Sequence, residues 1–118
     1  MSIRVSVLTL LALSATPLVA GERIGLHVTP SVAFAPADLQ VRASVPADDD
    51  NRALVIIAES HNFYSSSEIQ LEGDKAPTST TVEFRSVPVG LYSVRVVVKG
   101  SSGKEIGSAR TEVNIVGR

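Results

Sequence analysis

The sequence contains no cysteine and no tryptophan, and aromatic residues make up only 4% of its 118 residues. Without cysteine no disulfide can hold the fold, so its stability must come from burial of aliphatic side chains. The absence of cysteine also excludes a lipoprotein, whose lipid anchor is attached to that residue. The absence of tryptophan argues against a sugar-binding surface, because such surfaces usually stack the sugar on that side chain.

Clustered basic residues are also missing. The chain has 11 Lys and Arg residues against 12 Asp and Glu residues, and these charges are scattered along it. Binding to a nucleic-acid backbone needs a basic stripe, and binding to an anionic membrane needs a polybasic cluster. We therefore expect neither nucleic acid nor a membrane surface as a partner.

The first 21 residues differ from the rest of the chain. Arg4 supplies one positive charge, residues 5–15 are almost all apolar, and small residues follow near Ala20 and Gly21. This order of regions is that of a secretory signal peptide. We predict that residues 1–21 are a cleaved signal peptide and that residues 22–118 form one exported domain, either secreted or periplasmic.

The apolar run is shorter than the roughly 20 residues that cross a bilayer, so we expect no transmembrane span in the mature chain. An uncleaved N-terminal anchor is the alternative. Export without cysteine is common in bacterial envelopes, which favours a bacterial source.

The remaining chain shows the two-residue periodicity of β-strands and no pattern of a helix. Turn-forming clusters rich in Gly, Pro, Asp and Ser separate the strand segments. Seven strands are predicted, at residues 24–28, 39–45, 53–58, 67–72, 80–85, 90–99 and 109–115, with Val32 and Phe34 continuing the first across a kink. Seven short strands in about 100 residues predict an all-β, antiparallel, seven-stranded immunoglobulin-like sandwich. A closed barrel is the competing architecture.

Residues 53–58 are apolar at every position and β-branched in the middle. Such a run is typical of a central strand covered on both faces, or of a strand that flanks a contact with a partner.

Residues 88–96 read Pro-Val-Gly-Leu-Tyr-Ser-Val-Arg-Val. This stretch resembles the entry into the penultimate strand of fibronectin type III and related bacterial immunoglobulin-like domains, and residues 35–41 similarly resemble the entry into the second strand. The resemblance implies a tyrosine corner, in which the Tyr92 hydroxyl bonds the backbone near the preceding loop. The chain departs from the family in having no tryptophan in the third strand and no cysteine pair. The fold itself indicates little about function, because domains of this fold serve many functions.

Two features of the sequence contain residue types that can bind metal ions. Residues 48–51 read Asp-Asp-Asp-Asn, but adjacent side chains diverge, so a solvated acidic loop is favoured over a calcium site. The two histidines, His27 and His61, are candidate copper ligands, because this chain resembles small periplasmic copper carriers of the CopC type in its strand entry. Their resemblance would imply an N-terminal histidine and a later Asp-x-His as copper ligands, and this chain has neither. We expect no cofactor and no bound metal.

Enzyme motifs are also absent from the sequence. Lys104 follows Gly103, but Val98 stands where a phosphate-binding loop needs its first glycine. Serine is abundant, yet no Gly-x-Ser-x-Gly elbow occurs and only two histidines could act as a base. The sequence therefore predicts that the protein is not an enzyme.

Phe63 and Tyr64 are adjacent aromatic residues between two predicted strands. Either one of them points outward as an anchor for protein contact, or both pack against the edge of the sandwich. We predict an exported binding or structural module that makes protein–protein contacts in the cell envelope or outside the cell. The alternative is a periplasmic metal-binding carrier, of copper or calcium type, that uses His27, His61 and the acidic loop.

Overall fold

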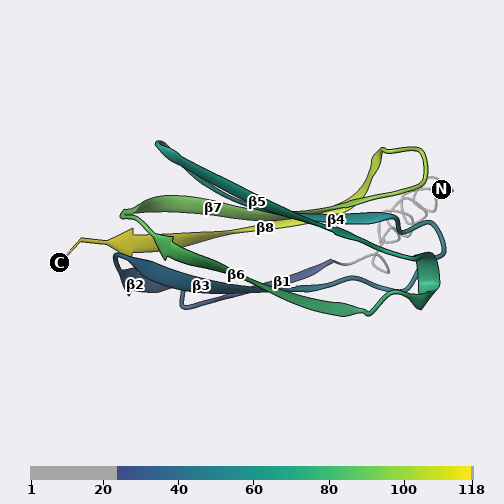
Figure 1. The fold of residues 1–118 in the computed structure, drawn as a ribbon, viewed down its shortest axis with the longest axis horizontal. Coiled ribbons are helices and arrows are strands. Elements are labelled where there is room, and N and C mark those ends of the chain that lie inside the picture. Colours follow the sequence, from purple (N-terminus) through teal and green to yellow (C-terminus); the bar gives the residue numbers. More distant parts are fainter. Residues whose placement is uncertain (1–23, 118) are drawn as a thin grey trace, which may run out of the picture.

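The computed structural model describes residues 24–117 and shows a β-sandwich with a three-stranded and a five-stranded sheet (Figure 1). The strand orders are β1-β3-β6 and β2-β8-β7-β4-β5. The strands are β1 (Gly25–Thr29), β2 (Val32–Phe34), β3 (Ala37–Ser44), β4 (Ala53–Ser60), β5 (Phe63–Gln70), β6 (Ser79–Val87), β7 (Gly90–Lys99) and β8 (Glu105–Val116). A single 3-10 turn, Gly73–Lys75, joins β5 to β6. The all-β prediction is confirmed.

The predicted signal peptide, residues 1–21, lies outside the described residues. Within residues 24–117, no helix has the length and apolar character that crossing a bilayer requires.

The chain has eight strands where the sequence predicted seven, because the first predicted strand is divided between the two sheets. β1 pairs antiparallel with β3, whereas β2 pairs parallel with β8. The change of sheet occurs at Pro30 and Ser31, where the proline has no N–H to donate to a strand ladder. Every other strand pairing in the described chain is antiparallel.

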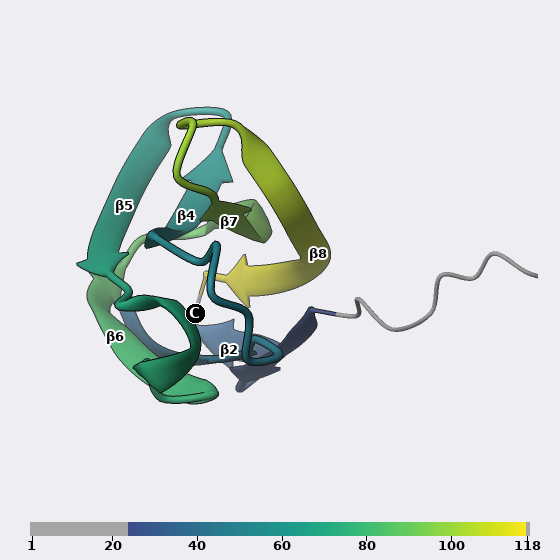
Figure 2. The same cartoon turned by 90° about the vertical axis from the view of Figure 1, so that its right-hand side faces the viewer.

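The two sheets face each other (Figure 2). Mostly aliphatic side chains fill the core between them. The core draws on alternate residues of the longer strands, as the two-residue periodicity predicted. Its completely buried members include Leu39, Leu54, Ile56, Tyr92, Val94, Val96 and Ile115. Because no disulfide links the sheets, burial of these side chains is the main stabilising contribution.

β4 is the all-apolar strand, and it lies between β7 and β5. Leu54 and Ile56 are completely buried against the core, and Ile57, on the opposite face, is only 7% exposed. Val55, also on the outer face, is partly buried, so the inner face of the strand is completely covered and the outer face is covered less fully.

β5 begins earlier than the sequence predicted. Phe63 and Tyr64, expected between strands, are its first two residues and pair with Ser60 and Glu59 of β4. The turn between β4 and β5 is consequently very short, with His61 and Asn62 at its tip.

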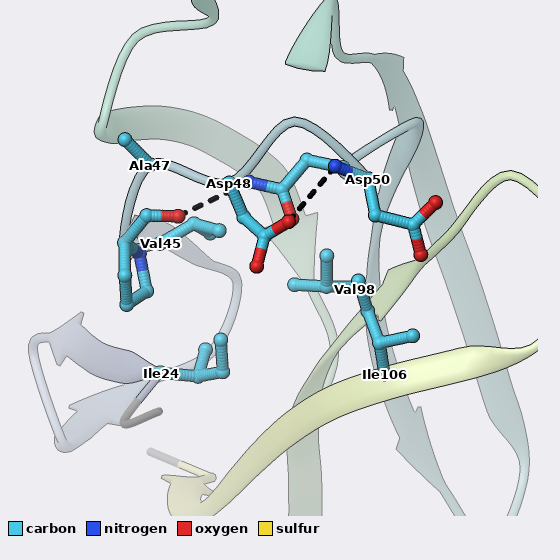
Figure 3. Close-up of a pocket in the computed structure, with 9 residues that line it drawn as sticks. Ile24, Val45, Ala47, Asp48, Asp50, Val98 and Ile106 are labelled. Carbon is cyan, nitrogen blue, oxygen red and sulfur yellow. Dashed lines mark hydrogen bonds between the residues drawn. The ribbon is translucent and has the colours of Figure 1, made fainter. Parts of the chain in front are cut away.

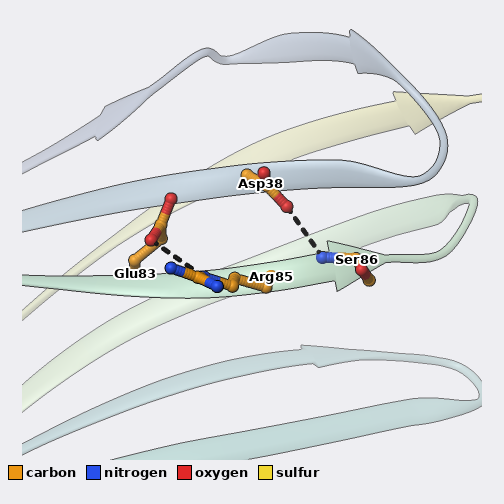
Figure 4. Close-up of polar contacts among 4 residues, drawn as sticks. All are labelled: Asp38, Glu83, Arg85 and Ser86. Atoms are coloured by element: carbon orange, nitrogen blue, oxygen red, sulfur yellow. Dashed lines mark hydrogen bonds and ion pairs between the residues drawn. The ribbon is translucent and has the colours of Figure 1, made fainter.

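β6 carries a bulge near its end, shown in Figure 4. Arg85 and Ser86 together oppose the single residue Asp38 of β3, and Ser86 has a φ of 55°. The Ser86 N–H donates a hydrogen bond of 2.9 Å to the Asp38 carboxylate. Asp38 thus holds a backbone conformation that non-glycine residues rarely adopt, and the bulge sets the direction in which the chain enters β7.

Candidate functional site

An apolar surface lies at one end of the five-stranded sheet, and we call it the end patch. It consists of four exposed side chains, Val32, Phe34, Val89 and Leu91, which are 51–62% exposed. Large exposed hydrophobic side chains that gather in this way mark interaction surfaces more often than scattered ones do.

Strand pairing brings these residues together although they come from distant parts of the sequence. Val32 and Leu91 both lie opposite Asn114 of β8, one on each side of it. Phe34 lies opposite Val116 of β8. Val89 adjoins Gly117, the residue after Val116, since a Cβ added to Gly117 would lie 4.0 Å from Val89 Cγ2. The patch therefore spans β2, the end of β8 and the start of β7 on the outer face of the sheet.

Tyr92 fixes the backbone beneath the end patch. Its side chain is completely buried, and its hydroxyl donates a hydrogen bond of 2.9 Å to the carbonyl oxygen of Pro88. A Cβ on Gly90 would lie 3.2 Å from Tyr92 Cε1, so a glycine is needed where the chain passes over the ring. This bond is the one a tyrosine corner requires, and it holds Val89 and Leu91 at the surface on either side of Gly90.

The two adjacent aromatic residues of β5 point in opposite directions. Phe63 is half-buried and contacts the Tyr92 ring edge-on, with centroids 5.7 Å apart and planes at 74°. Tyr64 is 60% exposed on the outer face of the sheet, in the same cross-strand row as Glu59 and Ser93. Of these two aromatic residues, only Tyr64 is therefore exposed on the outer face, where a partner could contact it.

The opposite end of the sandwich holds a cavity of about 360 Å³, shown in Figure 3. Its apolar wall consists of Ile24, Val45, Val98 and Ile106, and Asp48 and Asp50 lie at its rim. The carboxylates of both acidic residues are used within the protein. Asp48 accepts the N–H of Asp50 at 2.8 Å, and Asp50 accepts the hydroxyl and the N–H of Ser101 at 2.6 and 3.1 Å.

The acidic loop is therefore docked on the loop between β7 and β8. A side chain at Gly100 would collide with the Asp50 carboxylate, so this close approach depends on a glycine. Asn51 is 4% exposed and donates a hydrogen bond of 3.1 Å to the carbonyl oxygen of Pro46. These contacts give the loop a structural role.

No family model and no curated protein matches the sequence. Solved structures match the fold. A superoxide reductase (neelaredoxin) from Ignicoccus hospitalis is 16% identical over 78% of this chain and 79% of its own, with a TM-score of 0.61. The sporulation control protein Spo0M from Bacillus subtilis is 12% identical over 81% of this chain, with a TM-score of 0.54. A family 76 glycoside hydrolase from a bovine Bacteroides thetaiotaomicron strain is 16% identical over 78% of this chain, with the same TM-score.

This chain spans 49% of the Spo0M chain and 20% of the glycoside hydrolase chain. The proteins share a β-sandwich fold with this chain. At these identities the likeness concerns the fold alone, and a fold of this kind supports many functions.

One histidine lies in the three-stranded sheet and the other in a turn of the five-stranded sheet. His27 is exposed in β1, opposite Arg42, and His61 is exposed in the turn between β4 and β5. Among residues 24–117, no group of three or more His, Cys, Asp or Glu side chains is arranged to hold a metal ion.

The end patch was not predicted from the sequence. One signal was present, because Leu91 is a large apolar residue out of phase with Tyr92, Val94 and Val96, whose side chains form the buried face of β7. The partners of Leu91 in the patch could not be found in this way, since only the strand order places β2 beside β8.

The Asp50 contacts predict a measurable pH effect. The hydroxyl of Ser101, and then its N–H, donate to the carboxylate and lower the pKa of Asp50, whereas partial desolvation opposes them. Because the folded-state pKa lies below the unfolded one, this contribution to stability is present above about pH 4 and is lost as the pH falls through the folded-state pKa. Replacing Ser101 with alanine should move the Asp50 pKa part of the way back to its ordinary value.

This prediction is checked by NMR titration of the Asp50 carboxyl carbon. Ser102→Ala is the matched control, because Ser102 is an exposed neighbour in the same loop. An Asp50 pKa that is the same in wild type, Ser101→Ala and Ser102→Ala would contradict the assigned cause.

Proposed function

We propose that the protein is an exported, non-enzymatic module of fibronectin type III or bacterial immunoglobulin-like type that binds another protein through the end patch. The main supporting observation is that four large apolar side chains, Val32, Phe34, Val89 and Leu91, are exposed together at one end of the five-stranded sheet. Exposing such side chains to water costs free energy that contact with an apolar partner surface would recover.

The composition of the patch supports a protein partner. Aliphatic and aromatic anchors surround one polar residue, the exposed Asn114, which is a hydrogen-bonding group suited to a complementary protein surface. The tyrosine corner beneath the patch keeps Val89 and Leu91 in place before binding. A preorganised surface loses less conformational entropy on association than a mobile one.

The signal-like N-terminus supports a place of action in the cell envelope or outside the cell. The partner would then be another envelope or extracellular protein. A photo-crosslinking amino acid at position 91, introduced into the protein in its native cells, would join it to that partner, and mass spectrometry of the adduct would identify the partner and the mature N-terminus.

Binding to the purified partner should depend on the end patch. We expect Phe34→Ser and Leu91→Ser each to weaken the affinity about fivefold or more, because truncating an apolar anchor in the centre of an interface typically costs about 1 kcal/mol or more. Isothermal titration calorimetry measures the effect. Ile106→Ser is the matched control, since Ile106 is also an exposed apolar residue but lies at the opposite end of the sheet.

The control variant should bind like wild type, and circular dichroism should show that all three variants are folded. Unchanged affinity of both patch variants, or an equal loss in Ile106→Ser, would overturn the assignment of the patch.

A further inference from the structure

β5 is an edge strand whose outer side has no partner strand within the described chain. It is eight residues long, pairs only with β4, and keeps a continuous register from Phe63 to Gln70. Alternate N–H and C=O groups of such a strand point away from the sheet and can pair with another strand. β5 is therefore a ready template for strand addition.

The other edges are short or protected. β1 and β2 have five and three residues, and β6 carries both the bulge at Ser86 and the exposed charged pair Glu83–Arg85. Bulges, charges and short length are the features that keep sheet edges from associating. β5 has neither lysine nor proline and no register shift, and its single charge is Glu68, so it is a long edge that lacks most of these features.

The β4–β5 hairpin also stands apart from the three-stranded sheet. In Figures 1 and 2 the hairpin tip lies away from β6, and β6 pairs only with β3. No strand of the described residues therefore pairs with the outer edge of β5.

We infer that β5 pairs antiparallel with β5 of a second copy of the chain, with Ser66 facing Ser66. This register is self-complementary. On the inner face it places Phe63 opposite Ile69 of the second copy and Ser65 opposite Ser67, and on the outer face it places Tyr64 opposite Glu68. Apolar side chains thus meet apolar ones, and no like charges face each other.

The alternation of faces in β5 selects this register over its neighbours. A shift of one residue would place the half-buried side chains opposite the exposed ones. Centring the pair on Ser67 would place Ile69 opposite Ser65 and leave Phe63 beyond the end of the opposing strand. Centring it on Glu68 would bring two carboxylates together, which is destabilising.

The size of the contact indicates how stable the dimer is. Seven facing residues extend over roughly 24 Å of strand. An edge contact one strand wide buries less surface than the roughly 800 Å² per partner of a standard stable interface. The dimer is therefore reversible and depends on concentration, and it leaves the end patch at the far edge of the same sheet exposed.

Single-cysteine variants test both the dimer and its register, because the chain has no cysteine of its own. Facing Cα atoms in an antiparallel pair are about 4.5–5.5 Å apart, within the range of about 4.4–6.8 Å that a disulfide spans. Ser66→Cys should therefore form a covalent dimer in a glutathione buffer. Tyr64→Cys and Glu68→Cys are matched controls, since in this register each lies roughly 14 Å from its own copy.

We expect Ser66→Cys to crosslink at least tenfold faster than either control alone, and an equal mixture of the two controls to crosslink through Tyr64→Cys with Glu68→Cys. Equal rates for all three variants, or fastest crosslinking of Glu68→Cys alone, would overturn the inference.

Sedimentation equilibrium of the unmodified protein gives an independent readout. We expect a monomer–dimer equilibrium with a dissociation constant below about 1 mM, and a dissociation constant at least tenfold higher in Ser66→Lys, which places two like charges face to face. Ser108→Lys makes the same change at an exposed position of β8 and should associate like wild type. A protein that stays monomeric throughout, or a dimer unaffected by Ser66→Lys, would contradict the inference without bearing on the end patch.

Discussion

Replacing Tyr92 with alanine is expected to lower the free energy of unfolding by about 3–5 kcal/mol, which is the usual cost of removing a large buried aromatic side chain. The Tyr92 ring is completely buried, contacts Phe63 edge-on and carries the hydroxyl bonded to Pro88. Domains of this size are stable by about 5–15 kcal/mol, so the variant should be close to unfolding. Urea denaturation followed by circular dichroism measures the change.

Tyr92→Phe separates the hydroxyl from the ring. It keeps the ring and removes only the bond to the Pro88 carbonyl, so we expect a loss of about 1–3 kcal/mol. Tyr64→Phe is the matched control, because Tyr64 is 60% exposed, and its effect should stay within about 0.5 kcal/mol. If Tyr92→Phe were no more destabilising than Tyr64→Phe, the corner bond would contribute nothing to stability.

Replacing Ile56 with alanine should lower the free energy of unfolding by about 2–5 kcal/mol. Ile56 is completely buried in the middle of β4, between Val96 of β7 and Ser67 of β5, where the surrounding strands can collapse only partially into the space left behind. Thermal or urea unfolding, analysed as a two-state transition, gives the value.

Val55→Ala is the control on the same strand. Val55 lies on the outer face and is only partly buried, so the expected loss is about 1 kcal/mol. Equal losses in the two variants would show that the two faces of β4 are not buried to the different extents described above.

Much of the fold could be predicted because side-chain alternation is a local property of the sequence. In β7, Tyr92, Val94 and Val96 are buried, while the residues between them are not, as the pattern indicates. The motif around Tyr92 also indicated the hydrogen bond that the structure places at Pro88.

The division of the first strand could not be predicted, because β1 and β2 show similar patterns and only their long-range partners differ. The early start of β5 was missed for a related reason. The sequence predicted this strand only from residue 67, but the two residues His61 and Asn62 suffice for the turn, and Phe63 contacts Tyr92 on the inner face.

The end patch depends on the order of strands rather than on any local pattern. Val32 and Leu91 are far apart in the sequence and become neighbours only because β8 lies between β2 and β7. Alternation says which side of a strand is buried, but the grouping of exposed residues on the other side requires the tertiary structure.

The parallel pairing of β2 with β8 gives the protein a mechanical property. Ile24 lines the cavity beside Val98 and Ile106, whereas Gly117 adjoins Val89 in the end patch, so the two ends of the described chain lie at opposite ends of the sandwich. Pulling these ends apart slides β2 and β8 along each other (Figure 1). The bonds that flank this pair, from Ala35 to Val116 and from Asn114 to Ser31, are then strained simultaneously. Bonds loaded together in shear resist a pulling force better than bonds opened one at a time, so this strand pair acts as a clamp against extension.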